Sequence, residues 1–345
     1  MPRFAPPAPV FAWEYLRSGA HYVSPRFAEF RPLFAPSALV AESPIVSALP
    51  FERSVLSWNG TAAGRLEMRV RVGDAWTPYL ILAVLDGDKQ RSATDLELAP
   101  ILPASTNSIA ASAPAPLATV NTDTLLVAKG KVANAFQIRA TGPDLSGLRS
   151  LCVTSYRPVD RRFTTAPADG RAWGRSLEVP TRAQRDCEDP AIRPAVCSPT
   201  SLSMVLEYYR RPMRTIDVCR EVFDATAGIY GNWPANTATA ARLLGPRSWS
   251  AVVKMTGFDE VEREIAQNRP VVLSHRWNRG DLSNAPISRS LGHLIVCVGF
   301  TDTGDVVVND PAAKSGEVRR VYKRAELFRT WQERGEGIAY VIRSA

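Results

Sequence analysis

Cys197 stands where a helical pattern begins, in the run "RPAVCSPTSLSMVLEYY" (residues 193–209). Apolar side chains recur after it at helical spacing: Leu202, Val205, Leu206 and Tyr209. This spacing predicts an amphipathic helix that begins near Cys197 and has Pro199 in its first turn. Backbone N–H groups and the dipole at a helix N-terminus stabilise a thiolate. The position is therefore typical of a nucleophilic cysteine rather than of a buried structural one.

A nucleophilic thiol needs a base, and the chain has three histidines: His21, His275 and His293. His293 opens the strand-like run "GHLIVCVGF", and Asp310 closes the next such run, "DVVVND". In a hairpin with an even loop, His293 and Asp310 would be a direct pair, with Cβ atoms about 4.5–5.5 Å apart. We therefore expect Asp310 to orient His293 towards the thiol. An odd loop would select Asn309 instead.

The other two histidines have less to recommend them. His275 lies late in the strand-like run "PVVLSHRW", and no carboxylate is placed across a short hairpin from it. We expect it to be a half-buried core histidine that a hydrogen bond satisfies. His21 lies in a proline-rich stretch, where the sequence offers it no partner.

The elements that must position these residues divide the chain into four parts. Residues 1–50 are rich in Pro, Ala and aromatics and are expected to form an extended lead-in. Short runs of alternating polarity, such as "GRLEMRVRV", predict an all-β sandwich at 51–157, and the turn-rich residues 158–180 read as a linker. Residues 181–345 combine a first helix, a second helix at "FDEVEREIAQN" and later strands, which predicts an α+β domain.

Composition excludes several classes of protein. The chain of 345 residues is 45% hydrophobic and 22% charged, as in soluble globular proteins. Its net charge of +8 comes mainly from scattered arginines, so we expect no nucleic-acid partner. No apolar run approaches the ~20 residues of a membrane span, and no secretory signal is recognisable, which leaves the localisation open. The five cysteines have no metal-ligand spacing, so no disulfide framework, metal or cofactor is expected.

The ordered motifs "CSPTSLSMVLEYY", "GNWPANTATAARLLG", "GHLIVCVGF" and "VVVNDPAA" resemble the bacterial cysteine peptidase family 39 group. These are papain-like enzymes related to the peptidase domains that trim bacteriocin leader peptides. The resemblance covers about residues 178–345, and the strands before it are similar, more weakly, to the N-terminal region of some larger secreted members. It implies Cys197 as nucleophile, His293 as base and Asp310 as the orienting residue.

The resemblance also implies a glutamine before the cysteine that stabilises the oxyanion. The usual position, six residues upstream, holds Ala191, so we assign this role to Gln184 and assume a loop insertion that contains Cys187. The amide N–H of Cys197 would be the second donor. Ser198 stands where many relatives have glycine, which would narrow the approach to the thiol.

The Gly-rich stretch "GIYGNWPANT" (residues 228–237) offers two candidate substrate-binding residues, Asn232 and Trp233. Both could line a substrate groove. Helix capping by the asparagine and loop packing by the tryptophan are the competing interpretations.

These observations predict a papain-like thiol peptidase that acts on peptide or protein substrates through a thioester intermediate. One alternative is an amidase or transpeptidase that acts on cell-wall peptides with the same residues. Another is a module of this fold that binds peptides without cleaving them. The β-sandwich could contact a carbohydrate or a cell surface, or serve only as a structural companion.

Overall fold

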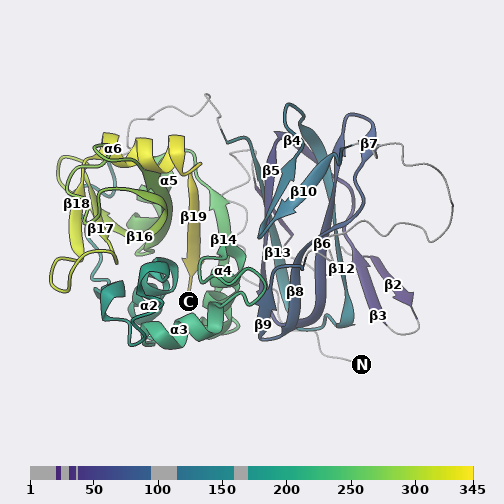
Figure 1. Ribbon diagram of the computed structural model, residues 1–345, viewed down its shortest axis with the longest axis horizontal. Coiled ribbons are helices and arrows are strands. Elements are labelled where there is room, and N and C mark those ends of the chain that lie inside the picture. The colour runs from purple at the N-terminus through teal and green to yellow at the C-terminus, as the bar shows by residue number, and fades with distance from the viewer. Residues whose placement is uncertain (1–20, 25–30, 36–37, 95–114, 159–169, 345) are drawn as a thin grey trace.

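The computed structural model describes residues 21–24, 31–35, 38–94, 115–158 and 170–344, and the expected lead-in before residue 21 lies outside this part. Two halves stand side by side (Figure 1). Strands up to β13 form one half. The other contains the helices α2 to α6 around a third sheet, and α4 faces the first half.

The N-terminal β region consists of two antiparallel sheets. One has the order β1-β13-β5-β11-β10, and the other has the order β2-β3-β12-β6-β8-β9, with β4 paired to β12 and β7 paired to β6. The strand bounds are β1 (His21–Ser24), β2 (Arg31–Ala35), β3 (Ala38–Glu42), β4 (Val46–Phe51), β5 (Arg53–Gly60), β6 (Ala62–Val72), β7 (Ala75–Trp76), β8 (Leu80–Gly87), β9 (Lys89–Arg91), β10 (Ala118–Asn121), β11 (Thr124–Val127), β12 (Ala133–Asp144) and β13 (Leu148–Tyr156).

Apolar side chains of both sheets meet in one core. Leu66, Met68 and Val70 alternate along β6 and are completely buried, as period-two patterning requires. Leu56 of β5 and Leu151 of β13 belong to the same cluster from the other sheet. The two sheets therefore pack face to face.

The expectation of a separate lead-in over residues 1–50 needs correction. β1 pairs with β13, and β3 and β4 both pair with β12, so the described residues of this stretch belong to the two sheets. The prolines of this stretch argue against strands in the sequence. Proline is nevertheless compatible with the ends and edges of sheets.

The C-terminal region has a six-stranded sheet of order β14-β19-β15-β16-β17-β18. Its strand β19 lies between β14 and β15, although it follows both in the chain. The strands are β14 (Trp249–Lys254), β15 (Val271–Trp277), β16 (Ser290–Phe300), β17 (Val306–Asn309), β18 (Arg319–Tyr322) and β19 (Ile338–Arg343). The helical elements are η3 (Gln184–Asp186), η4 (Arg193–Ala195), α2 (Cys197–Tyr208), α3 (Thr215–Val222), α4 (Trp233–Leu244), α5 (Phe258–Ala266), α6 (Arg324–Phe328) and the π-helix η5 (Arg329–Arg334).

The segment after residue 170, expected as part of a linker, belongs to this region. Leu177 and Val179 are buried in its core, and Ser176 forms a β-bridge with Gly299. A Cβ at Gly299 would lie 2.1 Å from the carbonyl oxygen of Arg175, so only glycine allows this close approach.

The two regions are joined by buried polar contacts. Asn59 of β5 donates to the Ser250 carbonyl (3.0 Å) and accepts from the Ser250 N–H (2.8 Å). The hydroxyl of Thr154 donates to the carbonyl of Val252 (2.7 Å). Val55, from the N-terminal side, is buried in the C-terminal core. β5 and β13 of the first region therefore lie against β14 of the second.

Within the described residues, no helix is both long enough and apolar enough to cross a membrane.

Candidate active site

Cys197 is the first residue of α2, as the spacing of apolar residues predicts. The N-cap, Val196, gives no side-chain cap, and its carbonyl accepts the N–H of Thr200 (3.0 Å). Cys197 is partly exposed, whereas the other four cysteines are buried: Cys152, Cys187, Cys219 and Cys297. The thiol at the helix start is thus the most accessible of the five.

His293 and Asp310 form a buried hydrogen-bonded pair. Nε2 of the imidazole lies 2.8 Å from Oδ1 of the carboxylate, which leaves Nδ1 as the ring nitrogen for the thiol. The carboxylate also accepts the Tyr322 hydroxyl (2.6 Å) and the Ala312 N–H (2.8 Å). Both side chains are almost inaccessible, so these three donors fix the position of the carboxylate.

The register of this hairpin differs from the predicted one. Phe300 pairs with Val306, so the loop between them has five residues and is odd rather than even. The direct pairing of His293 with Asp310 is also wrong, because the β16–β17 ladder ends at the pair Val296–Asn309.

A β-bulge in β16, between Cys297 and Gly299, changes the parity again beyond the loop. The bulge returns Asp310 to the face of His293. It occurs where Gly299 meets the segment at Ser176. Two deviations from the expected hairpin therefore cancel.

Asn309 points away from the imidazole. Its amide donates to the carbonyls of Val179 (3.1 Å) and Pro180 (3.2 Å), and its Oδ1 accepts from Arg319 (3.0 Å). These contacts fasten the segment after residue 176 to β17. The geometry around His293 thus favours Asp310 over its neighbour.

The three groups shift each other's pKa values. Burial opposes the charged form of His293, but the charge and hydrogen bond of Asp310 and the contact with Cys197 raise its pKa to about 10. Burial also disfavours the Asp310 carboxylate, yet His293, Tyr322 and the Ala312 N–H lower its pKa to about 2. Burial raises the pKa of Cys197, but the hydrogen bond and charge of His293 and the Leu294 N–H bring it below its usual value. The site therefore favours a thiolate–imidazolium pair.

His275 lies beside this pair without joining it. It is the direct cross-strand partner of His293, and the ring centroids are 5.6 Å apart. Its ring stacks on Trp277 at 4.7 Å, and Nδ1 lies 3.4 Å from the Thr330 hydroxyl. It is fully buried rather than half-buried, and burial lowers its pKa to about 3. His21 lies in β1, in the other region of the chain.

Gln184 lies in η3. Its amide donates to the carbonyl of Arg193 (2.9 Å), four residues before the cysteine, and its own N–H donates to the carbonyl of Pro311 (2.8 Å), beside Asp310. The intervening turn with the buried Cys187 is the assumed insertion, and Ala191 on it is exposed. Gln184 thus contacts a residue that precedes Cys197 and the residue that follows Asp310.

Asn232 needs correction as a substrate-binding residue. It is the N-cap of α4, where its side chain accepts the Ala235 N–H (3.0 Å), and only 5% of the residue is exposed. Its amide donates to the buried carboxylate of Asp224 (2.7 Å), which also accepts the Ser92 N–H (3.0 Å) from the other region. Its polar atoms are therefore committed to capping and to the contact between regions.

Trp233, the first residue of α4, is partly buried and lines a cavity between the two regions. Its N–H donates to the carboxylate of Asp123 (2.9 Å), which lies beyond β10 in the N-terminal region.

A network behind the cysteine has no signal in the sequence. The Ser198 hydroxyl donates to Oδ1 of Asn236 and lies 2.9 Å from the Tyr340 hydroxyl. All three residues are completely buried. Ser198 therefore points into the protein and does not narrow the approach to the thiol, contrary to the expectation. The network ties the start of α2 to α4 and β19.

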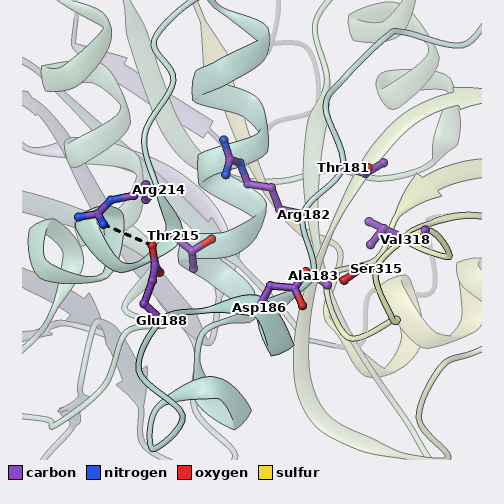
Figure 2. A pocket seen from close by; sticks show the side chains of 10 residues that line it. Thr181, Arg182, Ala183, Asp186, Glu188, Arg214, Thr215, Ser315 and Val318 are labelled. Atoms are coloured by element: carbon purple, nitrogen blue, oxygen red, sulfur yellow. Dashed lines mark hydrogen bonds and ion pairs between the residues drawn. The ribbon is translucent and has the colours of Figure 1, made fainter.

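A second cavity, of about 290 Å³, lies beyond Gln184 between η3 and the loop after Asp310 (Figure 2). Its charged side chains engage neighbours: Arg214 with Glu188 (3.7 Å), Arg182 with Glu207, and Asp186 with the Ser315 hydroxyl (2.5 Å). None of Cys197, His293 or Asp310 lines it. We therefore do not assign the reaction to this cavity.

Among the described residues, no group of three or more His, Cys, Asp or Glu side chains is arranged to hold a metal ion.

One family model and several solved structures are similar to this chain. Residues 176–338 match the family described as the Peptidase_C39 like family. A solved structure from Bacillus anthracis, described as a C39-like peptidase, is 16% identical, covers 49% of this chain and 98% of its own, and has a TM-score of 0.37. A double glycine motif protease from an AMS/PCAT transporter, in complex with the leader peptide, is 18% identical with a TM-score of 0.32, and the match covers 49% of this chain and 94% of that one. No curated protein matches the chain. Residues 176–338 of this protein are thus similar to the C39-like peptidase family.

Proposed function

We propose that the protein is a cysteine peptidase that hydrolyses peptide bonds through Cys197, His293 and Asp310. The observation that carries the proposal is the buried hydrogen bond between His293 and Asp310, with the thiol of Cys197 in contact with the same imidazole. The family match of residues 176–338 supports a peptidase activity, and the geometry supports these three residues as its machinery.

The proposed reaction is acyl transfer in two steps. The Cys197 thiolate attacks the peptide carbonyl, and the His293 imidazolium gives its proton to the leaving amine. Water then attacks the thioester while His293 accepts one of its protons, which releases the carboxylic acid and restores the Cys197 thiolate beside the His293 imidazolium. Asp310 keeps Nε2 occupied, so Nδ1 is the nitrogen that exchanges the proton.

The oxyanion needs two donors in this mechanism. We assign one to the backbone N–H of Cys197 at the start of α2 and the other to the side chain of Gln184. One N–H of that amide is bound to Arg193, and an amide group has a second N–H to donate.

We also infer the domain organisation that accompanies this function. Residues 51–157, with the strands that precede them, would form a β-sandwich, and residues 181–345, with the segment from residue 170, would form a papain-like peptidase domain. The apolar core shared by the two N-terminal sheets supports the first assignment, and the order of helix and sheet supports the second.

The test is digestion of a peptide library, with the products identified by mass spectrometry, beside a Cys197→Ala variant. We expect cleaved peptides with the wild type and none with the variant. Products joined to an added amine would indicate a transpeptidase instead. Peptides that bind without being cut would indicate a binding module, and equal cleavage by both proteins would refute Cys197.

A further inference from the structure

A cavity of about 330 Å³ lies between the two regions and has walls from both. The N-terminal region contributes Arg53, Tyr156 and the turn that contains Asp123. The C-terminal region contributes Trp233, Arg276 and Glu336. No residue of the proposed catalytic machinery lines this cavity, so it is free to hold another part of a bound substrate.

The cavity lies beside the start of α2. Trp233 begins α4, and one turn later Asn236 accepts the Ser198 hydroxyl next to Cys197. The same Ser198 hydroxyl lies 2.9 Å from that of Tyr340, and the N–H of Trp233 donates to Asp123 in the cavity wall (2.9 Å). Arg276, another residue that lines the cavity, follows His275 in β15, and His275 is the cross-strand partner of His293. A peptide held at Cys197 therefore has the cavity within its reach.

The carboxylates of the cavity are occupied. Glu336 accepts from Arg53 (2.6 Å), from Arg276 (2.8 Å) and from the Tyr156 hydroxyl (3.0 Å), and only 8% of its side chain is exposed. Asp123 accepts the N–H of Trp233 (2.9 Å) and the hydroxyl of Thr124 (2.9 Å).

The two arginines remain accessible. Their side chains are 36% (Arg53) and 44% (Arg276) exposed, although each gives an N–H to Glu336. A guanidinium has five N–H donors in a planar fork. The two positively charged guanidinium groups are thus the accessible charged groups of this wall.

The backbone holds Glu336 in place between the arginines. Its φ of 62° is in the left-handed region, which is uncommon for a residue other than glycine. Its carbonyl accepts the buried Lys254 ammonium at 2.5 Å. Strain of this kind persists where the surroundings enforce it, and it often marks functional sites.

We infer that this cavity is a substrate subsite that binds a carboxylate of the peptide through Arg53 and Arg276. The inference rests on the proposed peptidase function and adds a substrate class to it. Planar guanidinium groups match the geometry of a carboxylate. Because each region supplies one arginine, recognition of the carboxylate depends on how the two regions are placed relative to each other. The carboxylate is that of an acidic side chain or that of the C-terminus of the peptide.

The experiment measures binding to the Cys197→Ala protein, which leaves the peptides intact. Fluorescence anisotropy compares labelled peptides that carry Glu or Gln at each position in turn, and peptides with a free or an amidated C-terminus. We expect one acidic form to bind about tenfold more tightly than its neutral counterpart, as a charge-assisted hydrogen bond provides. A preference at an internal Glu identifies a side-chain site, and a preference for the free acid identifies a terminus site.

Variants in the Cys197→Ala background assign the effect. Arg53→Gln should remove most of the preference for the acidic peptide. Arg53→Lys should keep part of this preference, and it replaces Arg53→Gln as the test if that variant folds poorly. Arg71→Gln is the matched control, because this arginine of the same region contacts Asn134 outside the cavity. Equal binding of acidic and neutral peptides, or a preference that survives in both Arg53 variants, overturns the inference. Cleavage by the wild type is a separate measurement, so the proposed function can fail or hold on its own.

Discussion

His293 and His275 lie opposite each other on adjacent strands, and both are almost completely buried. Burial, with a further contribution from the charge of His293, lowers the pKa of His275 to about 3. The pKa of His293 is instead raised, to about 10, because Asp310 is hydrogen-bonded to it and Cys197 contacts it. The comparison teaches that the neighbouring carboxylate, rather than burial, decides which histidine can carry a proton at neutral pH.

The largest expected effect separates the two histidines directly. His293→Ala should lower kcat/KM at least ~10²-fold, because both half-reactions lose their proton carrier. His275→Ala should mainly lower stability, by about 1–3 kcal/mol, through loss of a packed ring. Steady-state kinetics and thermal unfolding of both variants make the test. A folded but inactive His275 variant beside an active His293 variant would reverse our assignment.

Asp310→Asn should lower the pKa of His293 towards that of His275. The change keeps the shape but removes the charge that stabilises the imidazolium, and we expect a loss of roughly 10–10³-fold in kcat/KM. The imidazolium of the wild type should be lost as pH rises through about 10, so activity falls there. In the variant this alkaline limb should move to lower pH, which a pH profile of kcat/KM would record.

The control for that variant is Asn309→Asp. A carboxylate at position 309 would face the carbonyl oxygens of Val179 and Pro180. These oxygens would repel it, which lowers the stability of the protein. The alkaline limb should stay where it is in the wild type. A greater shift in this variant than in Asp310→Asn would identify Asn309 as the orienting residue.

The thiol that contacts His293 should react before the buried ones. With iodoacetamide at about pH 6, we expect Cys197 to be labelled at least tenfold faster than any other cysteine, because its pKa is lowered and it is partly exposed. Burial raises the pKa of Cys152 and of Cys297 to about 12. Peptide mapping by mass spectrometry gives the order of labelling, and earlier labelling of Cys187 or Cys219 would contradict the assignment.

The smallest effect concerns the support of Asp310. Tyr322→Phe removes one of the hydrogen bonds to this carboxylate, so we expect a loss of about two- to tenfold in kcat/KM. The alkaline limb should shift less than in Asp310→Asn. A loss as large as that of Asp310→Asn would mean that the hydroxyl has a role beyond holding the carboxylate.

The sequence was sufficient to predict the local parts of the site. A thiol at a helix start has a short-range signature, and α2 begins at Cys197 as expected. The strand periods of β15 and β16 were equally clear. The preference for Asp310 over Asn309 agrees with the hydrogen bond to His293, although it was argued from an even loop that the protein does not have.

The rest depends on contacts distant in the chain. The β16 bulge occurs where Gly299 meets Ser176, and no local pattern around His293 reveals that encounter. The structural role of Asn232 also depends on a distant contact, because its partner Asp224 accepts a second hydrogen bond from Ser92 of the other region. Such features follow from how remote segments meet, which one sequence does not encode at short range.

The place of β19 in the sheet has a consequence for synthesis of the protein. This strand separates β14 from β15, and it carries Tyr340, whose hydroxyl contacts Ser198 next to the nucleophile. A ribosome completes β14 and β15 before it reaches residues 338–343, so the two strands wait for the one that joins them. The thiol and the imidazole are therefore synthesised before the strand that completes their sheet. The sheet closes only when β19 enters between β14 and β15.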